Sequence, residues 1–78
     1  MVKDYSRSEI EYGIEEWIVG KNADRDKLIL RLKLLHGYSH KQIADHINGE
    51  EYPSDYHLEI RQIQRIIRKR CDVIFRHI

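Results

Sequence analysis

The sequence predicts an all-α fold, a small bundle of four helices that ends in one long helix. Three observations indicate this class. Apolar residues recur at intervals of three and four through most of the 78-residue chain, which is the spacing of one helix face. Two capping boxes, each with Ser followed three residues later by Glu or Gln, mark helix starts at Ser6 and Ser39. Glycine follows three of the periodic stretches, at positions 20, 37 and 49, as is common after helix ends.

Length and composition are those of a single domain. The 78 residues lie near the lower limit at which one hydrophobic core is sufficient, so we expect one domain over residues 1–78. Charged residues make up 35% of the chain, and no apolar run has the length of a membrane span or the pattern of a signal peptide. We therefore expect a soluble protein of the cytoplasm. The lone Cys71 is interpreted as a small buried hydrophobe rather than a reactive thiol.

The first helix is expected from Arg7 to Val19, with Ser6 as its N-cap. Its apolar face comprises Ile10, Ile14, Trp17 and Ile18. Its other faces are acidic and include Glu9, Glu11, Glu15 and Glu16. Because Trp17 is the largest apolar side chain of a short chain, we expect it to anchor the core; the alternative is a stacking platform for a nucleic-acid base.

The second helix is expected from Arg25 to His36, after a side-chain cap at Asn22 or Asp24. Its apolar residues cover much of its circumference: Leu28, Ile29, Leu30, Leu32, Leu34 and Leu35. A helix with so wide an apolar surface is packed on more than one side. We therefore expect it to be the central element of the bundle.

The stretch around Ser39 contains the parts of a helix end followed at once by a helix start. Gly37 can adopt the left-handed conformation that ends the second helix, and the side chain of Ser39 can form a reciprocal capping box with Gln42. The third helix is expected from Ser39 to about Asn48. Its small Ala44 allows a second helix to cross closely, as in the first helix of a helix-turn-helix, which we place at residues 39–70.

An irregular segment, residues 49–58, separates the third helix from the fourth. Pro53 and its polar neighbours indicate a loop, which is longer than the turn of about three or four residues found in helix-turn-helix motifs. Its acidic residues are unfavourable beside a phosphate backbone. Tyr52, Tyr56 and His57 either pack over the edge of the core or reach towards a ligand.

The fourth helix is expected from Leu58 to the C-terminus. Its apolar side comprises Ile60, Ile63, Ile66, Ile67, Cys71, Val73, Ile74, Phe75 and Ile78. Its opposite side comprises Arg61, Gln62, Arg65, Arg68, Lys69 and Arg76, interrupted only by Asp72. Arg70 falls inside the apolar arc; it either extends past the edge of the core or marks the point where the helix leaves it.

The basic side of this helix has the chemistry of nucleic-acid recognition. A guanidinium group matches the acceptors of guanine in the major groove, and a glutamine amide matches adenine. We expect three residues of its early turns to face bases: Arg61, Gln62 and Arg65. We expect four further residues to contact phosphates: His40, Lys41, Arg68 and Lys69. A solvated helix face with no partner would have a similar sequence.

Charge is distributed unevenly along the chain. The net charge is only +1, but residues 1–57 contain 8 Lys and Arg against 11 Asp and Glu, whereas residues 58–78 contain 6 against 2. The positive charge is therefore concentrated in the fourth helix. Such asymmetry indicates a polyanionic partner, which we expect to be double-stranded DNA.

Two stretches resemble a known family: residues 37–44, GYSHKQIA, and residues 60–67, IRQIQRII. Together they resemble region 4 of bacterial sigma factors, in the form found in small proteins of Gram-positive bacteria and their phages. The resemblance covers about residues 24–78, and it implies that the second helix of the motif enters the major groove with Arg61, Gln62 and Arg65. The chain departs from the family in its enlarged turn, which either bulges out or changes the docking geometry of the two helices.

Catalysis and metal binding have little support in the sequence. His36 and His40 stand at i and i+4, but Gly37 interrupts the helix between them, and no second ligand pair has zinc spacing. No Gly-rich phosphate loop and no set of nucleophile, base and orienting group can be identified. We expect no enzyme activity, no cofactor and no metal ion.

The sequence thus predicts a sequence-specific DNA-binding transcription regulator of phage or mobile-element type. The alternative is a protein-binding module, an inhibitor or sigma-like adaptor that docks its basic helix face on RNA polymerase or another protein machine. The apolar C-terminal end of the long helix also predicts a homodimer, which would read two half-sites about one helical turn apart.

Overall fold

The computed structural model describes residues 5–51 and 58–77, and within these ranges the fold is helical. The α-helices of the described ranges are α1 (Arg7–Trp17), α2 (Ala23–Leu30), α3 (His40–His46) and α4 (Ile60–His77). Two π-helical segments extend α2 and α3: η2 (Arg31–Leu35) and η3 (Ile47–Glu51). The described residues form no strand, so the expected all-α class with four α-helices is confirmed.

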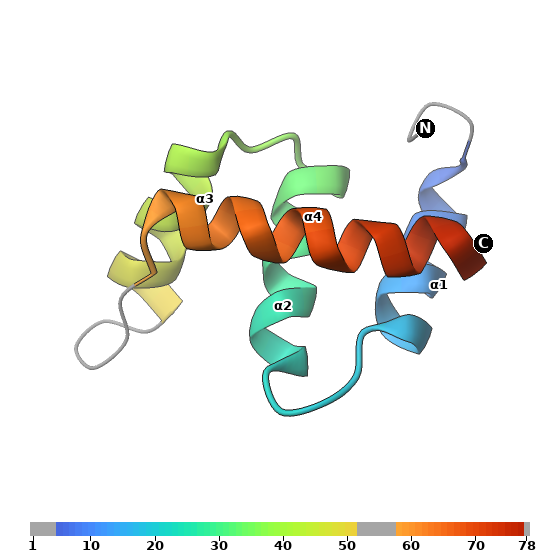
Figure 1. Ribbon diagram of the computed structural model, residues 1–78. Helices are drawn as coiled ribbons and strands as arrows, with labels where there is room; N and C mark the ends of the chain where they lie inside the picture. The colour runs from blue at the N-terminus through green and yellow to red at the C-terminus, as the bar shows by residue number, and fades with distance from the viewer. Residues whose placement is uncertain (1–4, 52–57, 78) are drawn as a thin grey trace.

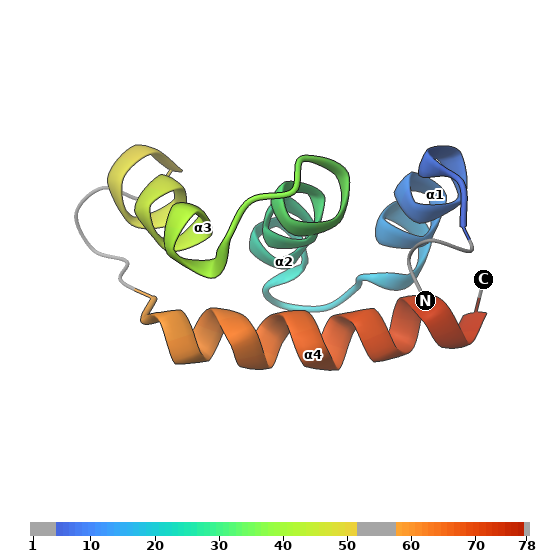
Figure 2. The same ribbon diagram turned by 90° about the horizontal axis from the view of Figure 1, so that it is seen from above.

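The three short helices form one layer and α4 forms the other (Figure 1). In Figure 2, α1, α2 and α3 lie side by side along one side of α4, with α3 near its start, α2 near its middle and α1 near its end. The second helix therefore occupies the central place in its layer. No helix of the described ranges lies on the other side of α4 (Figure 2).

Both expected capping boxes are present at the starts of α1 and α3. The Ser6 hydroxyl accepts from the Glu9 backbone N–H at 3.1 Å, and the Glu9 carboxylate accepts from the Ser6 N–H at 2.9 Å. The Ser39 hydroxyl accepts from the Gln42 N–H at 3.1 Å, and the Gln42 side chain accepts from the Ser39 N–H at 2.8 Å. These bonds satisfy N–H groups that have no partner inside the helix. Local sequence therefore defines both starts.

The second helix differs from the expected one at both ends. It begins at Ala23 with Asn22, one of the two expected positions, as its N-cap residue, but the Asn22 side chain forms no cap hydrogen bond. The Asp26 N–H instead donates to the Asn22 backbone carbonyl at 2.9 Å. The α-helix continues as η2, after which Gly37 has the expected positive φ of 71°. The helix end is closed by Tyr38, whose N–H donates to a carbonyl of η2.

The core consists of aliphatic side chains from both layers. Its buried members are Ile10, Ile14, Ile18, Ile29, Leu30, Leu32, Ile43, Ala44, Ile47, Leu58, Ile63, Ile67 and Ile74. Helical spacing identified nearly all of these positions, because each contributing helix presents one side to the opposite layer. The three buried isoleucines of α4 fix which of its sides faces solvent.

Two residues of the expected apolar faces lie outside the core. Trp17 is 37% exposed and Ile60 is 43% exposed, so the expectation that Trp17 anchors the core is wrong. Trp17 is the last residue of α1 and Ile60 is the first of α4, so both stand at helix ends, where burial is only partial. The Trp17 ring instead lies against the His77 ring, with centroids 4.2 Å apart.

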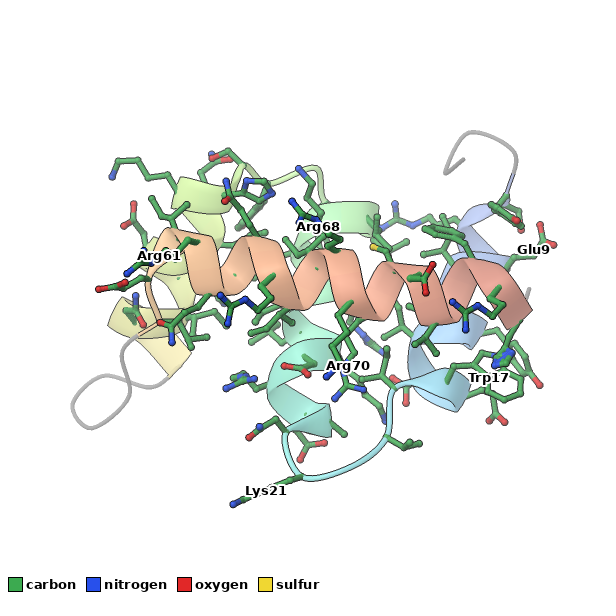
Figure 3. The ribbon with its side chains drawn as sticks, in the orientation of Figure 1. Glu9, Trp17, Lys21, Arg61, Arg68 and Arg70 are labelled. Carbon is green, nitrogen blue, oxygen red and sulfur yellow. The ribbon has the colours of Figure 1, made fainter. Side chains whose placement is uncertain are left out.

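A buried carboxylate joins α2 to α4. Asp26 is only 3% exposed; its Oδ2 accepts from Arg70 Nε at 2.8 Å and its Oδ1 accepts from Arg25 Nε at 3.0 Å. Figure 3 shows Arg70 at the edge of α4 beside α2. Arg70 lies in the apolar arc of α4 because it has a carboxylate to bind there. The ion pair fixes the middle of α4 against α2.

Candidate nucleic-acid interface

The side of α4 that is turned away from the other layer is strongly basic. We call it the outward face of α4, and its exposed members are Arg61, Arg65, Arg68, Lys69, Asp72 and Arg76. On a helix with about 100° per residue, these positions lie opposite the buried Ile63 and Ile74. Figure 3 shows Arg61 near the start of α4 and Arg68 near its middle. Burial of the isoleucines therefore directs the cations to solvent.

The cations at the two ends of this face have carboxylate partners. Arg61 Nε lies 3.4 Å from Glu59 Oε1. Arg76 forms an ion pair with Asp72, one turn earlier in α4. These pairs are exposed, so each contributes little stability. Their effect is to neutralise part of the positive charge at both ends of α4.

The cations in the middle of the face have no carboxylate partner among the described residues. Within the described ranges, Arg65, Arg68 and Lys69 form neither an ion pair nor a side-chain hydrogen bond. Among the described residues, the carboxylate nearest to Arg68 and Lys69 along α4 is Asp72, which is paired with Arg76. The cations of the outward face that have no ion pair among the described residues are therefore concentrated in the middle of α4.

Gln62 has a local structural role that the sequence reading did not assign. Its Oε1 accepts from the Glu59 backbone N–H at 2.8 Å, as the third residue of a capping box does. The Glu59 carbonyl in turn accepts from the Gln62 N–H at 3.0 Å and from the Ile63 N–H at 3.1 Å. The amide expected to read adenine is therefore engaged at the start of its own helix. The spacing from Glu59 to Gln62 is the sequence signal for this role.

His40, an expected phosphate contact, connects α3 to α4. Its Nδ1 lies 3.2 Å from Gln64 Nε2; because an amide NH₂ can only donate, His40 Nδ1 is the acceptor. The pKa of His40 is lowered, first by burial and then by the positive charge of Lys33. A neutral imidazole with Nδ1 as acceptor has its proton on Nε2. His40 can therefore contact a phosphate as a hydrogen-bond donor rather than as a cation.

Two lysines, Lys41 of α3 and Lys33 of η2, lie on the α3 side of the candidate interface. Lys41, expected at a phosphate, is exposed and lies 3.4 Å from Asp45 through its Nζ and Oδ2 atoms. Lys33 belongs to η2 and was not among the predicted site residues, although its charge acts on both His40 and Cys71. It precedes the turn that leads into α3. Sequence spacing alone gives no signal for its proximity to the site.

A side-chain bridge fixes the start of α4 relative to η3. Asn48 Nδ2 donates to the Leu58 carbonyl at 2.9 Å, and the Leu58 N–H donates to Asn48 Oδ1 at 2.8 Å. The Asn48 amide thus satisfies both the backbone N–H and the backbone carbonyl of Leu58. The Leu58 side chain itself is buried. The two ends of the enlarged turn are thereby held together. Tyr52, Tyr56 and His57 lie outside the described residues.

The lone thiol has the environment of a structural residue. Cys71 is partly covered, and burial raises the pKa of its thiol, an effect that Lys33 only partly opposes. A protonated thiol is a weak nucleophile. This supports the interpretation of Cys71 as a small apolar residue.

The described ranges contain neither a cluster of metal-ligand residues nor a membrane-spanning helix. No group of three or more His, Cys, Asp or Glu residues in these ranges is placed to hold a metal ion. None of the helices in the same ranges has the length and apolar content needed to cross a membrane. Comparison of the chain with family models, curated proteins and solved structures finds no match. The functional inference therefore depends on the geometry of the outward face.

Proposed function

We propose that this chain is a DNA-binding transcription regulator of phage or mobile-element type, which places the outward face of α4 in the major groove of duplex DNA. The observation that supports this most strongly is the exposed cationic face, which extends over the whole of α4 and has only one acidic member. A polyanion with regularly spaced charges is the natural partner of such a face. In this proposal the protein acts in the cytoplasm and has no catalytic step and no cofactor.

In this proposal α3 and α4 are the two helices of a helix-turn-helix, within a small four-helix bundle in which α4 crosses the other helices. The resemblance of their sequences to region 4 of sigma factors supports this assignment, as does the Ser39 capping box at the start of α3. The major groove is about 12 Å wide and admits one α-helix. The bridge between Asn48 and Leu58 supports a fixed relation of the two helices despite the enlarged turn.

The residues at the interface have different roles in this proposal. Arg65 faces bases, because its guanidinium has no partner within the described residues and can bind guanine through two hydrogen bonds. Arg61 and Gln62 face bases only after they release Glu59. The residues expected at phosphates are His40, Lys41, Arg68 and Lys69.

We further propose that the protein binds DNA as a homodimer that reads two half-sites. Light scattering in the micromolar range is expected to give the mass of two chains. A monomer at every concentration, or a selected DNA site without dyad symmetry, would remove this part of the proposal and leave DNA binding intact.

A protein-binding module is the second candidate function, and the enlarged turn of residues 49–58 favours it. A segment longer than a usual helix-turn-helix turn, with several acidic residues, is unfavourable close to a phosphate backbone. In this second candidate the outward face of α4 docks on an acidic surface of RNA polymerase or of another protein machine.

Fluorescence anisotropy with labelled duplexes separates the two candidates. We expect the wild type to bind a site selected from random duplexes more tightly than the nonspecific Kd of about 10⁻⁴ to 10⁻⁶ M at physiological salt. Arg65→Ala should cost about 1 to 3 kcal/mol on that site and relax the preference at one base pair, whereas Lys69→Ala should weaken all sequences equally. Glu11→Gln, in the opposite layer, is the matched control and should change nothing.

Binding of duplex DNA no tighter than this nonspecific level would reject the DNA-binding proposal. The same conclusion follows if Arg65→Ala and Lys69→Ala leave duplex binding unchanged while thermal melts show both variants folded. An acidic protein surface would then be the remaining partner for the outward face.

A further inference from the structure

The cations of the outward face fall into two groups with different surroundings. Arg61 and Arg76, the end cations, are paired with Glu59 and Asp72. Arg65, Arg68 and Lys69, the central cations, have no ion pair within the described ranges. A helix-turn-helix is expected to read DNA with the first turns of its second helix, yet here the first turn of α4 is the part whose polar groups are already engaged.

Ion pairing changes what a cation can contribute to DNA binding. An unpaired cation that meets a phosphate displaces a condensed counterion from the DNA, and this release is the main electrostatic gain. A cation that keeps its carboxylate brings a negative charge to the phosphate as well. The carboxylates of Glu59 and Asp72 therefore reduce the contributions of Arg61 and Arg76 to binding.

The central cations are also arranged so that they can contact both walls of a DNA groove. With about 100° per residue, Arg68 lies about 60° to one side of Arg65 and Lys69 lies about 40° to the other side. All three are exposed within about one turn of α4. A helix that enters a groove with Arg65 at its deepest point therefore directs Arg68 and Lys69 towards opposite walls, where the phosphates of the two strands lie.

We infer that the contact with DNA is centred on the second and third turns of α4, with Arg65 towards the groove floor and Arg68 and Lys69 at the phosphates of the two strands. This inference rests on the proposed DNA-binding function and specifies the part of α4 that performs it. It assigns Arg61 and Gln62 to the start of the helix instead of to bases. Few base pairs are then read directly, and backbone contacts dominate the affinity.

The number of cations that take part determines how steeply affinity falls with salt. At about 0.9 counterions per phosphate contact, the three central cations contribute no more than about −2.7 to the slope of log K against log salt, and a phosphate contact of Lys41 adds about −0.9 to this value and to the five-cation value below. With the central cations alone, affinity falls about 40-fold between about 50 and 200 mM salt. Participation of all five cations of the outward face gives a slope of about −4.5 and a loss of about 500-fold over the same range.

The test is the salt dependence of duplex binding, measured by anisotropy for the full chain and for single alanine variants. Arg68→Ala and Lys69→Ala should each make the slope less steep by about one. Arg61→Ala and Arg76→Ala should change it by less than half as much, although both remove the same charge from the same helix. Circular dichroism melts confirm that every variant is folded.

Two gain-of-binding variants test the neutralisation directly. Glu59→Gln and Asp72→Asn free Arg61 and Arg76, and each should steepen the slope by about one. The gain should be lost when the freed arginine is removed as well, in Glu59→Gln/Arg61→Ala and Asp72→Asn/Arg76→Ala. Glu16→Gln, which removes an exposed carboxylate from α1 in the other layer, should have no effect on the slope.

The outcomes distinguish this inference from the function on which it rests. If no duplex binds above the nonspecific level, the proposed function fails and the inference fails with it. If duplex binds with a slope near −4.5, and Arg61→Ala is as damaging as Arg68→Ala, DNA binding stands and the inference is overturned. Gains that persist in the double variants, whose net charge equals that of the wild type, also overturn it, because they would arise from loss of the carboxylate itself and not from the freed arginine.

Discussion

Arg68 and Arg70 are separated by one residue of the same helix, yet they belong to two different environments. Arg70 is on the inward side of α4, where its guanidinium donates to the buried carboxylate of Asp26. Arg68 is on the outward face, where it has no ion pair within the described residues. The same side chain therefore stabilises the fold at one position and is available to a ligand at the other.

The difference shows that residue type alone does not identify a binding residue. In this helix the inward side is occupied by buried isoleucines and one compensated arginine, whereas the outward side is occupied by cations that the fold does not need. Substitutions on the inward side should therefore change stability, and substitutions on the outward face should change binding.

The largest expected effect on stability is that of removing the carboxylate of Asp26. Asp26→Ala should lower the free energy of unfolding by about 3 to 5 kcal/mol, because Arg70 would be left as an uncompensated charge beside the core. Urea unfolding measures this change. The control is Asp26→Ala/Arg70→Met, which should recover most of the loss. A single variant as stable as the wild type would show that the inward side does not depend on this pair.

The next effect concerns the bridge that aligns the start of α4. Asn48→Ala removes both hydrogen bonds to Leu58, and we expect a loss of about 1 to 3 kcal/mol. Hydrogen exchange should show faster exchange at the Leu58 amide than in the wild type. Asn48→Asp keeps the acceptor and removes the donor, so its loss should be smaller. Unchanged exchange at Leu58 would contradict the bridge.

Replacing Trp17, at the end of α1, should have a smaller effect on stability. Because the ring is over one-third exposed and contacts His77, Trp17→Ala should cost about 1 to 2 kcal/mol, less than the 3 to 5 kcal/mol of a buried aromatic residue. The wild-type emission should be that of a partly solvated indole. His77→Ala should shift it further to long wavelength. Loss of folding in Trp17→Ala would restore the original expectation of a core anchor.

The smallest expected effect is a pH dependence due to His40. Its pKa is lowered in the folded chain by burial and by Lys33, so the unfolded chain binds a proton first as pH falls below about 6.5. The contribution of His40 to the free energy of unfolding is therefore fully present above that pH. It decreases as the pH falls further, until His40 also binds a proton in the folded state. His40→Gln should reduce the loss of stability as pH falls below about 6.5. An identical pH profile in the variant would contradict this.

Much of the fold could be predicted because its signals are local. The capping boxes at Ser6 and Ser39 and the left-handed Gly37 depend on residues within one turn of each other. The two sides of α4 follow from a helical period that sequence displays directly. The same helical period places the exposed cations Arg65, Arg68 and Lys69 on the side of α4 opposite its buried isoleucines.

The remaining features depend on contacts between distant residues. Arg70 stood out as a cation in an apolar arc, but the spacing of α4 does not reveal that Asp26 of α2 lies opposite. Periodicity also overestimated the burial of Trp17, since it cannot show that the indole ring lies against the exposed His77 at the edge of the two layers. At Asn48 and Gln62, the sequence pattern predicts a helix end and a base contact, whereas in the structure both side chains complete backbone hydrogen bonds.

The most direct test of the account is a map of the DNA-binding surface by NMR. Backbone amide shifts of the ¹⁵N-labelled chain are recorded as a short selected duplex is added. We expect the largest changes at Arg65, Arg68 and Lys69, smaller changes near His40, and none at Glu11 and Glu16 of α1. Changes centred on α1, or no change at the middle of α4 while the duplex is bound, would contradict the assignment of DNA binding to the outward face.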